Sequence, residues 1–172
     1  MLGRQWLGMG WLEQKRLDWT ERGFAQLAWL ARRRGRTNAL PAHLIVGIEG
    51  ETAAIFYLRR NGYIVVAGRW SSGDESGDID IVAWKGPQLC FVEVKTRTAH
   101  DMAPAESAVD SNKRRILRKL GRAYLRHLGM SQAPPTRFDV LSVYMEPGAE
   151  KEFVHFEGAF GWSEQPERDE VR

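Results

Sequence analysis

Acidic and basic residues alternate with apolar ones along two short stretches of the chain, and together they could do chemistry. The first stretch contains Asp78 and Asp80, and the second contains Glu93 and Lys95. The turn-forming run Lys85-Gly86-Pro87 lies between them, which predicts two strands joined by a hairpin. Because side chains alternate faces along a strand, the two aspartates share a face, and so do Glu93 and Lys95.

Carboxylates gathered beside a lysine favour a divalent metal ion. The other face of the hairpin is apolar, with Ile79, Ile81, Val92 and Val94, and must be buried, so unpaired acids at its margin would be unfavourable. Hard oxygen ligands suit Mg²⁺, with Mn²⁺ as a substitute, and these ions commonly bind one or two carboxylates, water and phosphate oxygens. We therefore expect a magnesium site on this hairpin.

The 172-residue chain has the composition of an ordinary globular protein. Hydrophobic residues make up 43% and charged residues 27% of it, and the length fits one domain with appendages. The net charge is +3 and the sequence pI is about 9.2. A basic excess of this size fits an anionic partner or solubility alone.

The single cysteine, Cys90, excludes an intrachain disulfide and is expected to be a small buried residue. A chain with only one cysteine fits the reducing environment of the cytoplasm. No stretch approaches the roughly 18 apolar residues of a membrane span, and the amino terminus lacks the uninterrupted apolar core of a signal peptide. We therefore expect a cytoplasmic protein without a membrane span.

Three segments are predicted along the chain. Residues 1–41 form a helical extension and linker rich in tryptophan and arginine, residues 42–161 form the main domain, and residues 162–172 form a charged, disordered tail. The extension is either a helix packed on the domain or on a partner, or an arm that contacts phosphates or a membrane surface.

Within the main domain, hydrophobic periodicity predicts alternating helices and strands. The expected helices cover residues 48–60 and 105–128, and the expected strands beside the hairpin cover residues 63–70, 138–145 and 152–156. Glu51 falls at the edge of the apolar stripe of the first helix. It could point inward or complement the dipole at the start of the helix.

The helix expected at residues 105–128 carries a row of arginines beside its apolar stripe. Arg115, Arg118, Arg122 and Arg126 recur at steps of three and four, which is typical of a solvated face and also suits a track of phosphate contacts. Lys113 falls within the apolar stripe. Its ammonium group must either extend to the edge of the core or point into the acidic site.

The order helix, three strands, helix, strand, with acids on the first helix and the hairpin, resembles the PD-(D/E)xK restriction-endonuclease-like nucleases. More specifically, residues 47–161 resemble the YraN-like family of uncharacterised bacterial proteins, predicted nucleases similar to Holliday junction resolvases. The residues that carry this resemblance are Gly50-Glu51, Gly62-Tyr63, Gly77-Asp78-Ile79-Asp80, Phe91-Val92-Glu93-Val94-Lys95-Thr96-Arg97, Ala108-Val109 with Lys113, and Arg137-Phe138-Asp139-Val140. The resemblance implies an α/β fold with a restriction-endonuclease-like core, in which helices flank a mixed central sheet (α-β-β-β-α-β).

Carried over residue by residue, the resemblance implies a role for each candidate. Asp80 and Glu93 would bind the metal ion together with the Val94 carbonyl, Lys95 would position or deprotonate the attacking water, and Glu51 would be an accessory acid. The family usually has glutamate where this chain has Asp78. Asp78 is therefore expected to support the site from its margin instead of binding the metal.

The expected function is a metal-dependent endonuclease that hydrolyses phosphodiester bonds in DNA, including branched or structured DNA. Basic side chains would contact the DNA backbone: Arg97, Lys113, Arg115, Arg118, Arg122 and Arg126. The resemblance also implies a homodimer. One alternative is a catalytically silent nucleic-acid-binding or adaptor module with the same fold. Another is a protein that docks on a membrane or a partner through its tryptophan-rich extension.

Overall fold

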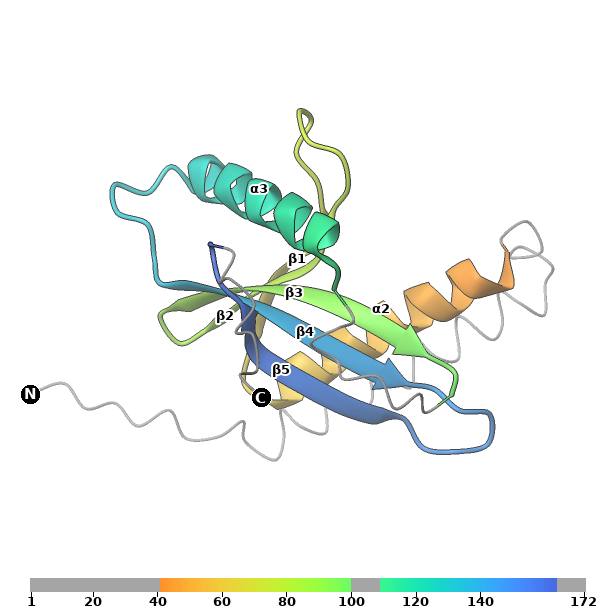
Figure 1. The fold of residues 1–172 in the computed structure, drawn as a ribbon. Helices are drawn as coiled ribbons and strands as arrows, with labels where there is room; N and C mark the ends of the chain where they lie inside the picture. Colours follow the sequence, from red (N-terminus) through yellow and green to blue (C-terminus); the bar gives the residue numbers. More distant parts are fainter. Residues whose placement is uncertain (1–40, 100–108, 164–172) are drawn as a thin grey trace, which may run out of the picture.

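A computed structural model describes residues 41–99 and 109–163, which form one mixed sheet flanked by two helices (Figure 1). The elements are α2 (Ala42–Arg60), β1 (Ile64–Trp70), β2 (Ile79–Lys85), β3 (Gln88–Arg97), α3 (Ser111–Leu128), β4 (Thr136–Tyr144) and β5 (Glu152–Phe160). This order confirms the predicted α/β fold and its α-β-β-β-α-β core, to which β5 adds a further strand. The predicted helix of the amino-terminal extension lies outside the described residues.

The five strands follow one another in the sheet in the order of the sequence. β3 and β4 are parallel, and every other neighbouring pair is antiparallel. A parallel pair needs a crossover connection, which α3 supplies on one face of the sheet. α2 covers the opposite face (Figure 1).

Each helix packs on its own apolar core. On the α2 side, Leu58 packs with Val92 and Leu141, whereas on the α3 side Leu120 packs with Phe91. β3 is buried on both faces, which explains its nearly continuous apolar run. A central strand of this kind gives the acids of the hairpin a rigid support.

Three sequence predictions of local structure need correction. α2 begins at Ala42 instead of residue 48, because Pro41 provides the start of the helix. α3 begins at Ser111 instead of Ala105, because the Asp110 side chain accepts a hydrogen bond from the backbone N–H of Lys113 at 2.8 Å and caps the helix. Ile79 packs on the α3 side, unlike Ile81, because regular β2–β3 pairing begins only at Ile81.

The ordered domain also extends beyond the predicted start of the tail. Trp162 donates a hydrogen bond from its indole to Thr136 Oγ1 at 2.9 Å, and its ring meets Phe138 edge-on, with the ring centres 4.7 Å apart. Residues 164–172 lie outside the described part. Neither helix in that part is long and apolar enough to cross a membrane.

Gly50 allows α2 to approach β3 closely just before Glu51. A Cβ atom on Gly50 would overlap Thr96 Oγ1 and come within 2.8 Å of Thr96 Cβ, whereas one on Gly47 would meet nothing within 4 Å. We expect Gly50→Ala to lower the free energy of unfolding by about 1–3 kcal/mol. Gly47→Ala should raise the free energy of unfolding by no more than about 1 kcal/mol, because alanine favours a helix. Urea unfolding measures both, and equal effects would show that the close approach does not restrict position 50.

Candidate functional site

Four carboxylates, which we call the acid cluster, converge from three parts of the chain. Glu51 comes from α2, Asp78 lies just before β2, Asp80 is on β2, and Glu93 is on β3. Burial raises the pKa of Glu51, and the charges of Asp78 and Glu93 raise it further. The structure thus brings the four predicted acids close enough to influence one another.

Glu93 is a nearly buried carboxylate held between two ammonium groups. Glu93 is only 3% exposed to solvent. Lys95 Nζ lies 3.0 Å from Oε1, and Lys113 Nζ lies 3.0 Å from Oε2. Glu93 and Lys95 therefore share a face as predicted. Of the two alternatives for Lys113, the structure selects the one in which its ammonium group points into the site.

Asp80 is the acid with the most strongly shifted pKa. Burial and the neighbouring Glu93 charge raise the pKa of Asp80 to about 7, against the opposing effects of a hydrogen bond and of Lys113. That hydrogen bond runs from the backbone N–H of Val94 to Asp80 Oδ2, at 2.7 Å. Burial and the charge of Glu93 thus outweigh the effect of Lys113, so an additional cation beside Asp80 would be favourable.

A cavity of about 480 Å³ opens beside the acid cluster, between α2 and the end of β3. Glu51 and Lys95 both line it, so a molecule in the cavity would meet an acid and an ammonium group of the site. The remaining lining residues are His43, Val46, Gly47, Val94, Thr96 and Thr98.

Arg69 is a third cation at the acid cluster, beside Lys95 and Lys113. Arg69 Nε donates a hydrogen bond to Asp78 Oδ2 at 3.2 Å. Burial alone would lower the pKa of Lys113, but its contact with Glu93 and the charge of Asp80 outweigh burial and raise it. Sequence reasoning missed Arg69, because an arginine near the end of an edge strand carries no signal that it will meet the acids.

The oxygen donors of the site fit a magnesium ion. In residues 41–99 and 109–163, no three histidine, cysteine or acidic side chains are grouped so as to hold a metal ion by themselves. Mg²⁺ typically takes only one or two carboxylates and completes its shell with water and phosphate oxygens. Glu93 Oε2 is buried and, apart from the ion pair with Lys113, has no hydrogen-bond partner in these residues. Asp80 and Glu93 are therefore suitable ligands.

The predicted row of DNA-binding arginines is only partly on the surface. Arg118 is 7% exposed and donates hydrogen bonds to the backbone carbonyls of Gly161, at 2.8 Å, and Ser163, at 3.2 Å. The prediction that Arg118 binds nucleic acid was therefore wrong, because this side chain holds the segment after β5 against α3.

The other three arginines of the row remain candidates for phosphate contacts. Arg115, Arg122 and Arg126 are exposed on α3. Arg115 donates a hydrogen bond to Asn112 Oδ1 at 2.7 Å, and Arg122 lies over the Trp162 ring. Arg97, at the end of β3, is half-buried. Contact of these side chains with DNA stays a prediction.

Residues 50–143, which include the acid cluster and both lysines, match the family described as Uncharacterised protein family UPF0102. The chain belongs to this family. Membership confirms the YraN-like resemblance. The match extends from the Gly50 contact to β4, so it covers every candidate catalytic residue.

Relatives of the UPF0102 chain come from several bacteria. A UPF0102 protein of Koribacter versatilis is 46% identical over 106 residues, which cover 62% of this chain and 73% of the relative. One from Solibacter usitatus is 42% identical over 114 residues, covering 66% and 84%. One from Porphyromonas gingivalis is 40% identical over 115 residues, covering 66% and 82%. These names state no activity, so the function must be argued from the site.

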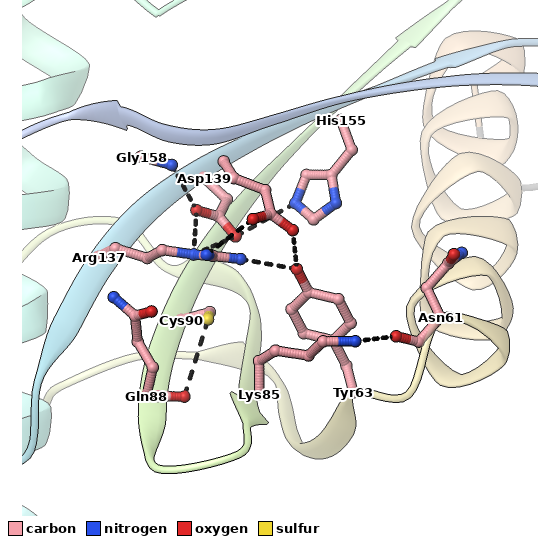
Figure 2. A network of polar contacts seen from close by, with 10 residues as sticks. Asn61, Tyr63, Lys85, Gln88, Cys90, Arg137, Asp139, His155 and Gly158 are labelled. Atoms are coloured by element: carbon pink, nitrogen blue, oxygen red, sulfur yellow. Dashed lines mark hydrogen bonds and ion pairs between the residues drawn. The ribbon is translucent and has the colours of Figure 1, made fainter. Parts of the chain in front are cut away.

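A second polar network in the UPF0102 chain shares no residue with the acid cluster (Figure 2). Asp139 is fully buried, and Arg137 Nε lies 2.9 Å from its Oδ1. His155 Nε2 lies 3.1 Å from Oδ2, and the Gly158 N–H donates to Oδ1 at 2.8 Å. Arg137 and Asp139 are part of the pattern that resembles the family, and their contacts here tie β4 to β5.

Tyr63 extends this network from the end of α2 to β5. Its hydroxyl donates to Glu157 Oε1 at 2.5 Å and accepts a hydrogen bond from Arg137 at 2.6 Å. Burial and the bond to Glu157 raise the pKa of Tyr63 well above its ordinary value. Burial also raises the pKa of Cys90 to about 11. Cys90 is thus the inert, buried residue that the sequence predicted.

Proposed function

We propose that this UPF0102 protein is a metal-dependent endonuclease that hydrolyses phosphodiester bonds of DNA. The observation that carries this proposal is that Asp80 and Glu93 lie close enough for their charges to interact, and that Glu93 contacts the ammonium group of Lys95, a residue that lines the cavity. Burial and the neighbouring Glu93 charge raise the pKa of Asp80 to about 7, so two carboxylates placed in this way are unfavourable for folding. Such arrangements concentrate at functional sites.

Asp80, Glu93 and the backbone carbonyl of Val94 would hold Mg²⁺, or Mn²⁺ in its place. When bound, such an ion lowers the pKa of a coordinated water and neutralises charge on the phosphate under attack. The protein supplies oxygen ligands, as these hard cations prefer.

Lys95 and Glu51 are the groups that would act on the substrate and on water in the cavity. Lys95 lines the cavity, and its ammonium group is suited to orient a water molecule there and to stabilise the charge that develops on the phosphate. The raised pKa of Glu51 suits a side chain that exchanges a proton with the same water. Lys113 holds Glu93 from the α3 side and fixes the direction of its carboxylate.

DNA is the substrate class that this arrangement favours. Arg115, Arg122 and Arg126 lie exposed on the helix that delivers Lys113 to the site. They would provide phosphate contacts that any DNA form can use. Branched or structured DNA and a homodimer, expected from the resemblance, stay predictions, as does action in the cytoplasm, expected from the single cysteine.

A second candidate function is a nucleic-acid-binding or adaptor module without turnover. The observation that favours it is that both oxygens of Glu93 already meet ammonium groups, at 3.0 Å each. A carboxylate whose two oxygens both contact ammonium groups could stabilise the fold without binding a metal ion. DNA affinity would then depend on the arginines and not on the acids.

Cleavage by the full-length protein distinguishes the two functions. We expect cutting of at least one of linear duplex, single-stranded and four-way-junction DNA with Mg²⁺, and none with EDTA. Glu93→Gln should reduce the rate by roughly 10³-fold or more. Glu157→Gln, the same change outside the acid cluster, should leave the rate of cleavage unchanged. A wild-type protein that binds all three DNA forms but cuts none with Mg²⁺ or Mn²⁺ would establish the adaptor module instead.

A further inference from the structure

Arg69 combines a strained backbone with an exposed charge at the edge of the acid cluster. Its φ angle is 49°, and in the described part of the chain it is the only residue other than glycine with a positive φ. The left-handed region is unfavourable for a residue with a long side chain, and glycine, asparagine and aspartate are its usual occupants. Strain of this kind concentrates at functional sites.

The sheet places this strained residue against the acids. The pairs on either side of it in the β1–β2 register put Arg69 directly opposite Asp80. Its Nε donates to Asp78 Oδ2 at 3.2 Å, and its charge opposes the rise in the pKa of Glu51 that burial causes. Arg69 therefore belongs to the site by position, contact and charge.

Arg69 is also the cation of the site that remains open to an anion. Its side chain is 62% exposed and uses only Nε, while its two terminal nitrogens bond to no residue of the described ranges. Lys95 and Lys113, by contrast, each place their ammonium group on Glu93. A guanidinium group with both terminal nitrogens available can bind two oxygens of one phosphate.

We propose that Arg69 binds a backbone phosphate of the nucleic acid next to the acid cluster, and that Asp78 is a positioning residue that holds the Arg69 side chain. This role rests on the proposed function, because it needs a polyanion at the site. It also accounts for Asp78, whose carboxylate contacts the Arg69 guanidinium group, as a residue that supports the site without binding a metal ion.

Replacing Arg69 by glycine separates the backbone from the side chain. Glycine adopts a positive φ without strain, so the urea midpoint of Arg69→Gly should equal or exceed that of the wild type. DNA cleavage should nevertheless fall roughly 10- to 100-fold in kcat/KM, mainly through KM. The slope of log Kd against log salt concentration should decrease in magnitude by about 0.9, the value for one phosphate contact.

Two further variants serve as controls for the charge. Arg59→Ala removes an equal charge from an exposed position in the last turn of α2, and should leave the rate of cleavage unchanged. Arg69→Lys keeps the charge but not the two-pronged geometry, so it should recover only part of the lost activity.

A double-mutant cycle tests the part played by Asp78. Asp78→Ala should raise KM in the wild-type background and have no further effect in the Arg69→Gly background, because the guanidinium group that it holds is then absent. An equal loss in both backgrounds would show that Asp78 acts on its own.

The outcomes distinguish this role from the nuclease function itself. If the wild type binds DNA without cutting it and Arg69→Gly still loses one phosphate contact, the nuclease function fails and the role of Arg69 stands. If the wild type cuts DNA and Arg69→Gly cuts equally well with an unchanged salt slope, the role of Arg69 is overturned. If the wild type shows no affinity for DNA, both are overturned.

Discussion

Replacing Asp80 by asparagine is expected to abolish DNA cleavage and, in the same variant, to make the metal-free protein more stable. Cleavage should fall by roughly 10³-fold or more, because one of two carboxylates that would bind the metal ion is lost. The free energy of unfolding should rise by about 1–3 kcal/mol at pH 8. Asparagine can still accept the hydrogen bond from the Val94 N–H, so the change removes mainly the charge.

The gain in stability should depend on pH in a defined direction. The pKa of Asp80 is about 7 in the folded protein, because of burial and of Glu93, against an ordinary value of 3.8. Between these values the folded state binds more protons than the unfolded state. The contribution of Asp80 to the free energy of unfolding of the wild type therefore falls as pH rises. Below about 4 both states are protonated and the penalty is absent, whereas above about 7 it is complete.

Urea unfolding of the metal-free wild type and Asp80→Asn between pH 5 and pH 8 measures this effect. The difference between the two proteins should widen as pH rises. Asp74→Asn, in the exposed loop before β2, is the matched control and should show no such trend. A variant that is less stable than the wild type at pH 8 would mean that Asp80 serves the fold and not a cation site.

Asp139→Ala should produce the largest loss of stability. Asp139 is fully buried, and its removal leaves Arg137 and the nearly buried His155 without their shared partner. Breaking a buried pair in this way lowers the free energy of unfolding by about 3–5 kcal/mol. Since Arg137 keeps its contacts with Tyr63 and Glu157, we expect a value near the lower end.

Glu157→Gln is the control for this network, because it changes the outer carboxylate, whose side chain is 52% exposed. It should lower the free energy of unfolding by less than about 1 kcal/mol. Urea unfolding at pH 7 compares the two variants. Cleavage per folded molecule should be unchanged in both, because neither residue belongs to the acid cluster. Similar losses of stability in the two variants would show that burial does not set the strength of this network.

The sequence predicted those features that depend on local periodicity. Alternation along β3 correctly placed Glu93 and Lys95 on one face. Helical spacing placed Lys113 within the apolar stripe and left two directions open for its ammonium group, of which the structure shows the one towards Glu93. The end of α3 at Gly129 was also predictable, because glycine readily adopts the left-handed conformation found there.

Features that depend on contacts between distant parts of the chain were not predictable in this way. Helical spacing predicted that Arg118 would lie in an exposed row. Its hydrogen-bond partners, however, are carbonyls more than forty residues later in the chain. The place of Arg69 opposite Asp80 likewise depends on how β1 pairs with β2. Asp139 did give a signal, because an acid within an apolar strand must have buried partners.

The most direct measurement of the cation site is calorimetric titration of the full-length protein with Mn²⁺ at pH 8, without DNA. We expect saturable binding to the wild type together with a rise in its melting temperature, because a ligand that binds only the folded state stabilises it. Asp80→Asn should show neither effect, and Arg59→Ala should show both. Equal binding to the wild type and Asp80→Asn, or no binding to either, would contradict the assignment of Asp80 and Glu93 as the ligands of a divalent metal ion.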